Sequence, residues 1–208
     1  MCGRFYIADE DETGEIQRMI EQAAQRQQQI LGEVTLRAGE ICPGMCAPAL
    51  ALGKHSQPMV FPMEWGFGVQ GKRVFNTRLE TAEEKPLFRE SFLARRCLLP
   101  MTHYFETGWE EREVPSLLGG QMAFQEKRRV RYAIRPAEEG PAYLAGIYRY
   151  EPGKRLPVFS VLTCAPDNSI AWLHDRMPVI LGAGAGRAFL SDARAAEKRE
   201  REMIFQAG

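Results

Sequence analysis

The chain has 208 residues, 45% of them hydrophobic and 26% charged, and its formal net charge at pH 7 is zero. These values are ordinary for a soluble globular protein and allow one domain with a sizeable core. Zero net charge argues against a protein that coats nucleic acid through charge alone, but it is compatible with a local basic groove. No apolar run approaches the ~18 residues that span a bilayer and no secretory leader opens the chain, so we expect a cytoplasmic protein without a membrane segment.

Short strands dominate the first part of the chain. A strand over residues 2–8 precedes an acidic run at 9–12 and a helix over about 13–31, which has one apolar face and a Gln-rich polar face. Further strands, broken by Gly and Pro, are expected at Val34–Arg37, Ala47–Leu52, Met59–Phe67 and Arg73–Phe75.

The second part of the chain continues this pattern. A helix over about 86–95 begins near Pro86 and turns Phe88 and Phe92 inward. Strands are expected at Cys97–Glu106, Gln121–Lys127, Arg131–Ile134, Tyr143–Tyr150 and Pro157–Thr163, with a short helix at Asn168–Leu173 and a surface helix over about 187–205. No internal repeat or linker divides the chain, so the sequence predicts one β-rich α/β domain over 1–208.

Cysteine stands second in the chain, directly after Met1. If Met1 is removed, Cys2 carries an α-amine and a thiol on adjacent carbons, and such a 1,2-aminothiol captures aldehydes. The amine condenses to a Schiff base, and the thiol then closes a five-membered thiazolidine ring. An internal cysteine cannot react in this way because its nitrogen is an amide. Small residues are also common in second position without any chemical role, so other segments must decide between the two interpretations.

Two further segments carry side chains suited to phosphate or proton chemistry. Asn76 and Arg78 would share one face of a strand, where Asn offers a donor and an acceptor and Arg a planar fork. Glu106 ends an apolar strand beside two aromatic residues, and desolvation there would raise the pKa of its carboxyl toward neutrality. Taken alone, a polar loop and a solvated strand end explain these residues more simply.

His174 is one of three histidines, and Arg176 and a proline turn at Pro178 follow it. Such a His/Arg pair can hold an anion, although a lone histidine is more often structural. Cys42 and Cys46 have the spacing of half a zinc site, but no second Cys/His pair matches them elsewhere. We therefore expect no metal and no cofactor, and the five irregularly spaced cysteines predict reduced thiols.

Seven blocks occur in a recognisable order from residue 2 to about 181. They are Met-Cys-Gly-Arg-Phe at the start, Trp65-Gly66-Phe67, Asn76-x-Arg78-x-Glu80-Thr81, Arg96-Cys97-x-x-Pro100 running into Tyr104-Phe105-Glu106, Ala145-Gly146-Ile147-Tyr148, Thr163-x-Ala165, and His174-x-Arg176-Met177-Pro178. In these blocks and their order the chain resembles the SRAP family (SOS response-associated peptidase).

The resemblance implies a single barrel-like domain with a mixed or antiparallel sheet and flanking helices. It implies a monomeric sensor of abasic sites in single-stranded DNA, in which Cys2 forms a thiazolidine with the ring-opened sugar and shields the lesion. This is Schiff-base chemistry of the lyase type, and the peptidase of the name refers to removal of the residue before Cys2. Asn76 would orient the site, Glu106 would be the acid/base, and His174 would assist proton transfer. The DNA-binding residues implied are Arg4, Arg78 and Arg176 for phosphates, and Trp65 and Phe67 for unpaired bases.

Some features depart from the family pattern, and other functions stay open. Many members have Trp directly after the catalytic Glu, whereas Thr107 and Gly108 precede Trp109 here, and the stretch between Trp65 and Asn76 is short. An N-terminal-nucleophile amidohydrolase or peptidase would use the same cysteine on an acyl carbon. A non-catalytic single-strand binder would not need this cysteine at all.

Overall fold

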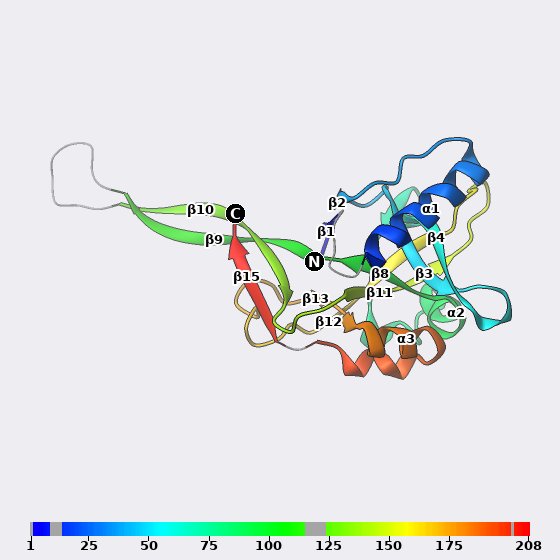
Figure 1. Cartoon of the computed structure of the whole chain (residues 1–208). Coiled ribbons are helices and arrows are strands. Elements are labelled where there is room, and N and C mark those ends of the chain that lie inside the picture. The colour runs from blue at the N-terminus through cyan, green and yellow to red at the C-terminus, as the bar shows by residue number, and fades with distance from the viewer. Residues whose placement is uncertain (1, 9–13, 115–123, 201) are drawn as a thin grey trace.

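The structure, a computed structural model, describes residues 2–8, 14–114, 124–200 and 202–208 (Figure 1). The helices in this part of the chain are α1 (Glu15–Leu31), α2 (Pro86–Ala94), α3 (Ala183–Ser191) and the 3-10 turns η1 (Lys54–Ser56), η2 (Leu79–Thr81) and η3 (Ala193–Lys198). One sheet contains β3 (Cys46–Leu52), β4 (Pro58–Trp65), β7 (Asn76–Arg78), β8 (Arg96–Met101), β11 (Ala142–Arg149), β12 (Val158–Cys164), β13 (Met177–Pro178) and β14 (Ile180–Gly182). A second contains β1 (Phe5–Ile7), β2 (Gly39–Ile41), β9 (His103–Val114), β10 (Phe124–Pro136) and β15 (Met203–Ala207), while β5 (Phe67–Val69) pairs with β6 (Lys72–Val74).

Five strands of the first sheet close into a ring. β4 pairs with β3, β3 with β8, β8 with β11 and β11 with β12, and β12 returns to β4. The β12–β4 and β12–β7 pairs are parallel, and the other pairs of this sheet are antiparallel. Every residue of β8 is buried, because α2 and α3 pack against a strand whose other face meets the core. The predicted fold class, a β-rich α/β fold with a mixed barrel-like sheet and flanking helices, is confirmed.

The second sheet places the N-terminus against a long hairpin. Its strand order is β15–β10–β9–β1–β2, and all its pairs are antiparallel. β9 and β10 project together from the body of the molecule, and β15 returns to the base of this hairpin near the C-terminus (Figure 1). The short strand β1 pairs with the start of β9, so the residues before Phe5 lie where β9 leaves the body.

Helix α1 buries the apolar face that the sequence predicts, with Ile16, Met19 and Ala23 inward. A residue near the C-terminal end of α1 explains why Val34–Arg37 does not form the strand that the sequence predicts. The buried Gln27 accepts hydrogen bonds on Oε1 from the amides of Thr35 (2.9 Å) and Leu36 (3.0 Å). These amides are therefore satisfied by a side chain and not by a neighbouring strand, and the segment is irregular.

Other predicted elements change type or length. Residues 168–173 form turns and not a helix. The predicted helix over 187–205 is wrong, because α3 ends at Ser191, Asp192 accepts from the Arg194 amide at the start of η3, and the chain then pairs with β10 as β15. The predicted strand Cys97–Glu106 is two strands, β8 and β9. The predicted strand Gln121–Lys127 begins outside the described residues, and its remainder forms β10 together with Arg131–Ile134.

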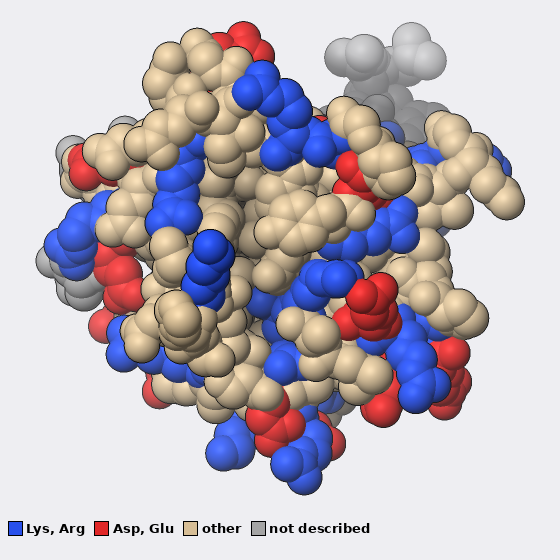
Figure 2. Space-filling view, turned by 90° about the vertical axis from the view of Figure 1, so that its right-hand side faces the viewer, with Lys and Arg blue, Asp and Glu red and all other residues tan. Residues whose placement is uncertain are grey.

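Charge is mixed over the surface. Figure 2 looks onto the end opposite the β9–β10 hairpin, where Lys and Arg gather around the middle of the face and Asp and Glu lie among them and toward the periphery. This agrees with a formal net charge of zero and with local basic areas. In the parts of the chain that the structure describes, no helix is long and apolar enough to cross a membrane.

Candidate active site

Cys2 lies before β1, and two other segments meet it there. The amide of Phe105 donates to the Arg4 carbonyl at 2.9 Å, which lays the N-terminal residues along β9 beside Glu106. From another direction, Nδ2 of Asn76 donates to the Cys2 carbonyl oxygen at 2.7 Å. Asn76 begins β7, which is fixed by parallel pairing with the buried strand β12. Both sheets thus contribute to the surroundings of Cys2.

The Cys2 thiol is wholly buried, with 0% of the residue exposed. Burial raises the pKa of this thiol to about 12, its weak hydrogen bond to the Arg4 carbonyl (3.8 Å) lowers it in part, and the charge of Glu106 raises it. The thiol is therefore protonated at neutral pH, and chemistry at its sulfur requires a base. Because the charge of Glu106 is felt at the thiol, this carboxylate is close enough to be considered for that role.

Tyr104 is a further residue of the site around Cys2, and the sequence analysis did not identify it. It lies two residues before Glu106 on β9, so both side chains point to the same face of the strand. Tyr104 is fully buried, and burial raises the pKa of its phenol, with further contributions from Cys2, Glu106 and Cys164. The only signal in the sequence was its spacing from Glu106.

The segment that carries His174 packs against the same face of β9. Gly108 lies two residues beyond Glu106, and a Cβ at Gly108 would be only 2.5 Å from Cδ1 of Leu173. Any larger residue at this position would require the Leu173 side chain to shift. The packing brings the segment around His174 to the part of β9 that holds Glu106.

Two contacts at Nδ1 define the state of the His174 ring. The Arg176 amide donates to Nδ1 at 3.0 Å, and Oδ1 of Asp175 lies 2.7 Å from the same atom. The first contact requires Nδ1 without a proton and the second requires a protonated one. The Asp175 side chain is 81% exposed, so water competes for its carboxylate and weakens this contact relative to that of the amide. With Nδ1 as acceptor, a neutral ring carries its proton on Nε2.

The three arginines implied as phosphate ligands differ in what they contact. Arg176 is only 12% exposed and donates to both carboxylate oxygens of Glu80 (2.9 and 2.7 Å) and to the Thr163 carbonyl (2.6 Å). It fixes the His174 segment to its neighbours and is not a free guanidinium on a rim. Arg78 is exposed at the end of β7, and Arg4 is 46% exposed and pairs with Glu40 at 2.8 Å.

The prediction that Trp65 and Phe67 stack on DNA bases is wrong, because both are fully buried. The Trp65 ring packs edge-on to Phe5 (5.2 Å between centroids) and parallel to Phe159 (5.9 Å), and its Nε1 donates to the Phe75 carbonyl at 2.8 Å. These rings fill the core where β1 meets the barrel.

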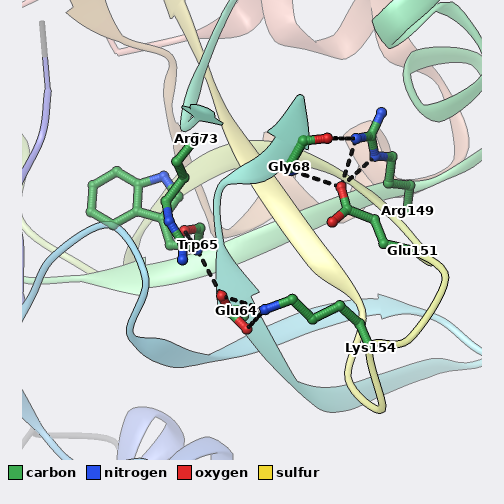
Figure 3. Close-up of polar contacts among 7 residues, drawn as sticks. All are labelled: Glu64, Trp65, Gly68, Arg73, Arg149, Glu151 and Lys154. Carbon is green, nitrogen blue, oxygen red and sulfur yellow. Dashed lines mark hydrogen bonds and ion pairs between the residues drawn. The ribbon is translucent and has the colours of Figure 1, made fainter. Parts of the chain in front are cut away.

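The short stretch after Trp65 is held by charged side chains on its outer side (Figure 3). The Glu64 carboxylate accepts from Arg73 (2.6 Å) and from Lys154 (2.9 and 2.7 Å). Glu151 accepts from Arg149 and from the Gly68 amide (2.8 Å). These contacts join β4–β6 to the β11–β12 connection and explain how so short a stretch is fixed.

Trp109, which the departure from the family pattern left in question, is 64% exposed. It lies on the same face of β9 as Phe105 and Thr107, and the Arg129 guanidinium is 5.9 Å from its ring centroid. β9 therefore carries an exposed indole on the face opposite Glu106.

A cavity of about 320 Å³ opens beside the N-terminus, lined by Gly3, Arg4, Phe105, Glu106, Thr107 and Arg131. Of these residues, the sequence analysis had singled out Arg4 and Glu106. Within the described ranges, no group of three or more His, Cys, Asp or Glu side chains is placed to hold a metal ion. Cys42 and Cys46 are free thiols, and the Cys42 sulfur lies 3.9 Å from a Glu40 oxygen.

The fold and this site define a β-rich α/β protein whose second residue is at the centre of a buried polar site. A family model described as SOS response associated peptidase (SRAP) matches residues 1–207, and the chain belongs to this family.

Relatives and solved structures agree with the family. The chain is 30% identical over 112 residues to abasic site processing protein YMR114C of Saccharomyces cerevisiae, covering 54% of this chain and 26% of the yeast protein. It is 28% identical over 114 residues to abasic site processing protein YoqW of Bacillus subtilis, covering 53% of this chain and 45% of that protein. The match thus spans less than half the length of each relative.

A crystal structure of a protein from Bacteroides thetaiotaomicron has a TM-score of 0.68 at 21% identity, covering 99% of this chain and 91% of that one. A phage-related protein from Bordetella bronchiseptica has a TM-score of 0.64 at 17% identity, covering 100% and 94%. At these identities the two structures show the fold alone.

Proposed function

We propose that this protein recognises abasic sites in single-stranded DNA and bonds to them covalently through Cys2 once Met1 has been removed. The observation that carries the proposal is the hydrogen bond from Asn76 to the Cys2 carbonyl beside Glu106, in a member of the SRAP family. The names of two relatives, both abasic site processing proteins, support this lesion as the substrate. We expect the protein to act as a monomer in the cytoplasm.

The proposed reaction joins the aldehyde carbon of the ring-opened sugar to both groups of Cys2. The amine adds to the carbonyl carbon, and the carbinolamine loses its hydroxyl with one proton as water to leave an iminium. The sulfur then adds to the iminium carbon while its proton passes to a base, which closes the thiazolidine. One water is released overall, and no oxidant or reductant is needed.

A thiol at this position has a protective consequence. An iminium that persists at the sugar promotes β-elimination of the 3′ phosphate, which cuts the strand. Ring closure by sulfur removes the iminium, so the strand stays intact. An amine without a neighbouring thiol, as on lysine, could not do this.

Glu106 is the group that we propose to move the protons. Burial holds the Cys2 thiol protonated, so closure needs a nearby base, and the charge of Glu106 acts on this thiol. The same carboxyl can return a proton to the departing hydroxyl. His174 would assist at the sugar through the Nε2 proton.

Asn76 orients the reactive residue. Its Nδ2 holds the Cys2 carbonyl, and its Oδ1 is buried without a hydrogen-bond partner among the described residues. A free α-amine on Cys2 would offer the missing donor. In this proposal Arg4 and Arg78 contact phosphates, and Arg176 positions the His174 segment through Glu80.

The test is a time course with Met-trimmed protein and a single-stranded oligonucleotide that contains one abasic site. We expect an adduct that survives heating on a denaturing gel with wild type, and only a heat-labile adduct with Cys2→Ala. A durable adduct from Cys2→Ala contradicts the proposal. Turnover of small amides without any durable adduct would instead indicate an N-terminal-nucleophile hydrolase.

A further inference from the structure

Three charged side chains form a chain of ion pairs on the outer face of the five-stranded sheet. Arg4 of the N-terminal segment contacts one Glu40 oxygen at 2.8 Å, and Arg131 of β10 donates to the other. Glu40 lies on β2, so the three residues come from three separate segments of the sheet. In the sequence Arg131 follows the basic residues 127–129, and nothing in this stretch indicates that Arg131 and Arg4 pair with the same glutamate.

Arg131 is held in place by aromatic rings. Its guanidinium carbon lies 3.4 Å from the Phe105 ring centroid. His103 meets Phe105 edge-on (4.7 Å between centroids), and Tyr6 stacks on His103 (5.0 Å, 4° between planes). A guanidinium stacked on a ring keeps its N–H groups in the ring plane, where they remain available to an anion.

The two arginines line the cavity of about 320 Å³ that also contains Glu106. Phe105, Thr107 and Arg131 share one face of the sheet, and the Glu106 side chain points to the opposite face of β9, so the charged groups on this side of the cavity are the two guanidinium groups. Nε of Arg131 is buried, and no residue in the described ranges accepts a hydrogen bond from it. A buried donor without an acceptor is costly, so a ligand that reoriented this side chain and accepted from Nε would remove that cost.

Glu40 stays ionised between the arginines. Burial alone would raise the pKa of its carboxyl, but the hydrogen bond and charge of Arg131, with the charge of Arg4, lower it overall. Two guanidinium groups around one carboxylate leave an excess positive charge. They are also held in one geometry before any ligand arrives.

We propose that Arg4 and Arg131 form the subsite for a backbone phosphate next to the abasic sugar, and that Glu40 occupies this subsite until the phosphate displaces it. The proposal rests on the function proposed above, because it takes DNA as the ligand. Arg4 lies two residues after Cys2, so a phosphate next to a sugar bonded to Cys2 comes within reach of Arg4, which shares Glu40 with Arg131. The planar fork of Arg131 suits two phosphate oxygens.

Non-covalent binding tests this without the chemistry of Cys2. The probe is a single-stranded oligonucleotide with one tetrahydrofuran site, which has no aldehyde, titrated at several salt concentrations. We expect Arg131→Gln to weaken binding about tenfold, since a hydrogen bond to a charged group contributes ~1.5 kcal/mol or more. The salt slope should also fall by about 0.7, the value for one phosphate contact on a single strand.

Arg135→Gln is the matched control. Arg135 lies four residues further along β10 on the same face, is exposed, and does not line the cavity. It should bind as wild type. Glu40→Gln removes the competing charge and should bind the probe several-fold more tightly. A variant that failed to fold would instead bind more weakly.

The outcomes separate this subsite from the proposed function. The phosphate subsite is contradicted if Arg131→Gln binds the probe as tightly as Arg135→Gln does. It is also contradicted if Glu40→Gln binds the probe more weakly while its unfolding temperature is unchanged. If the aldehyde oligonucleotide gives no durable adduct with wild type, while Arg131→Gln still weakens the tetrahydrofuran probe, the covalent function fails and the subsite stands. Thermal unfolding of each variant shows whether it is folded.

Discussion

Nδ2 of Asn76 donates to the carbonyl oxygen of Cys2 at 2.7 Å, although 74 residues separate them in the chain. This hydrogen bond ties the backbone of the short N-terminal segment before β1 to β7 in the barrel. The residue that would carry both reactive groups is thereby held against a rigid element.

Asn76→Asp tests the restraint. Aspartate has nearly the same shape, but an ionised carboxylate cannot donate to the Cys2 carbonyl. Loss of one such hydrogen bond should slow adduct formation with an abasic oligonucleotide by about tenfold. Binding of the tetrahydrofuran probe should stay as in wild type. Asn168→Asp, at an exposed turn, is the control, and equal rates for the two variants would show that the restraint has no role.

Glu106→Gln tests proton transfer. Glutamine keeps the shape and the hydrogen-bonding reach but cannot exchange a proton, so the rate at saturating DNA should fall roughly a hundredfold. Glu110→Gln is the control, since Glu110 lies on the same face of β9 and accepts from Tyr132. If Glu106→Gln abolished DNA binding and left the saturated rate unchanged, Glu106 would be structural.

Arg96 should stabilise the fold and not the chemistry. Its buried guanidinium donates to carbonyls at the C-terminal ends of two helices, namely those of Phe92 and Leu93 in α2 and of Phe189, Leu190 and Ser191 in α3. Arg96→Met leaves these carbonyls without their donor and should lower the free energy of unfolding by about 3 kcal/mol or more.

Urea unfolding measures this loss, and Arg95→Met is the control. Arg95 is partly exposed and pairs with the exposed Glu90, so its replacement should cost less than about 1 kcal/mol. Similar losses for the two variants would contradict the structural role of Arg96.

The buried thiol of Cys97 should make the protein less stable at alkaline pH. Burial alone raises the pKa of this thiol above the usual value near 9. A raised pKa means that the folded state keeps its proton where the unfolded state loses it. Stability is therefore intact below about pH 9 and falls above it, by about 1.4 kcal/mol per pH unit for each such thiol.

The thiols of the buried Cys2 and the half-buried Cys46, each with a pKa raised to about 12, add to this decline. Cys97→Ala should remove the contribution of this one thiol to the alkaline loss of stability. The difference in unfolding free energy between wild type and Cys97→Ala should therefore change by about 1 kcal/mol between pH 9 and pH 10. Parallel curves from urea unfolding at pH 8, 9 and 10 would contradict it.

The sequence was sufficient for the fold class and for the family, because the order and spacing of short motifs along the chain indicate both. It could not show which faces of the strands are covered. Trp65 and Phe67 have the residue type of a base-stacking surface, but β1 and β12 cover Trp65, and Phe88 of α2 and Arg149 of β11 pack on Phe67. Exposure depends on tertiary packing, which strand alternation does not reveal when both faces are buried.

The same reasoning explains the arginines. Arg176 has the sequence context of a phosphate ligand, yet Glu80 occupies both sides of its guanidinium fork. Arg131 has no distinctive sequence context, and it shares Glu40 with Arg4 only because β10 pairs with β9, β9 with β1 and β1 with β2. Contacts set by strand order across a sheet cannot be obtained from local pattern.

Intact-mass and fragment-mass analysis of the adduct tests the central claim most directly. Met-trimmed protein is incubated with the abasic oligonucleotide, digested with protease and nuclease, and the modified peptide is sequenced. The account predicts one modification, on the N-terminal residue Cys2, with a mass equal to peptide plus sugar fragment less one water and with no free thiol at that residue. A modification at a lysine, or one at the N-terminus that leaves the Cys2 thiol free to alkylate, would contradict it.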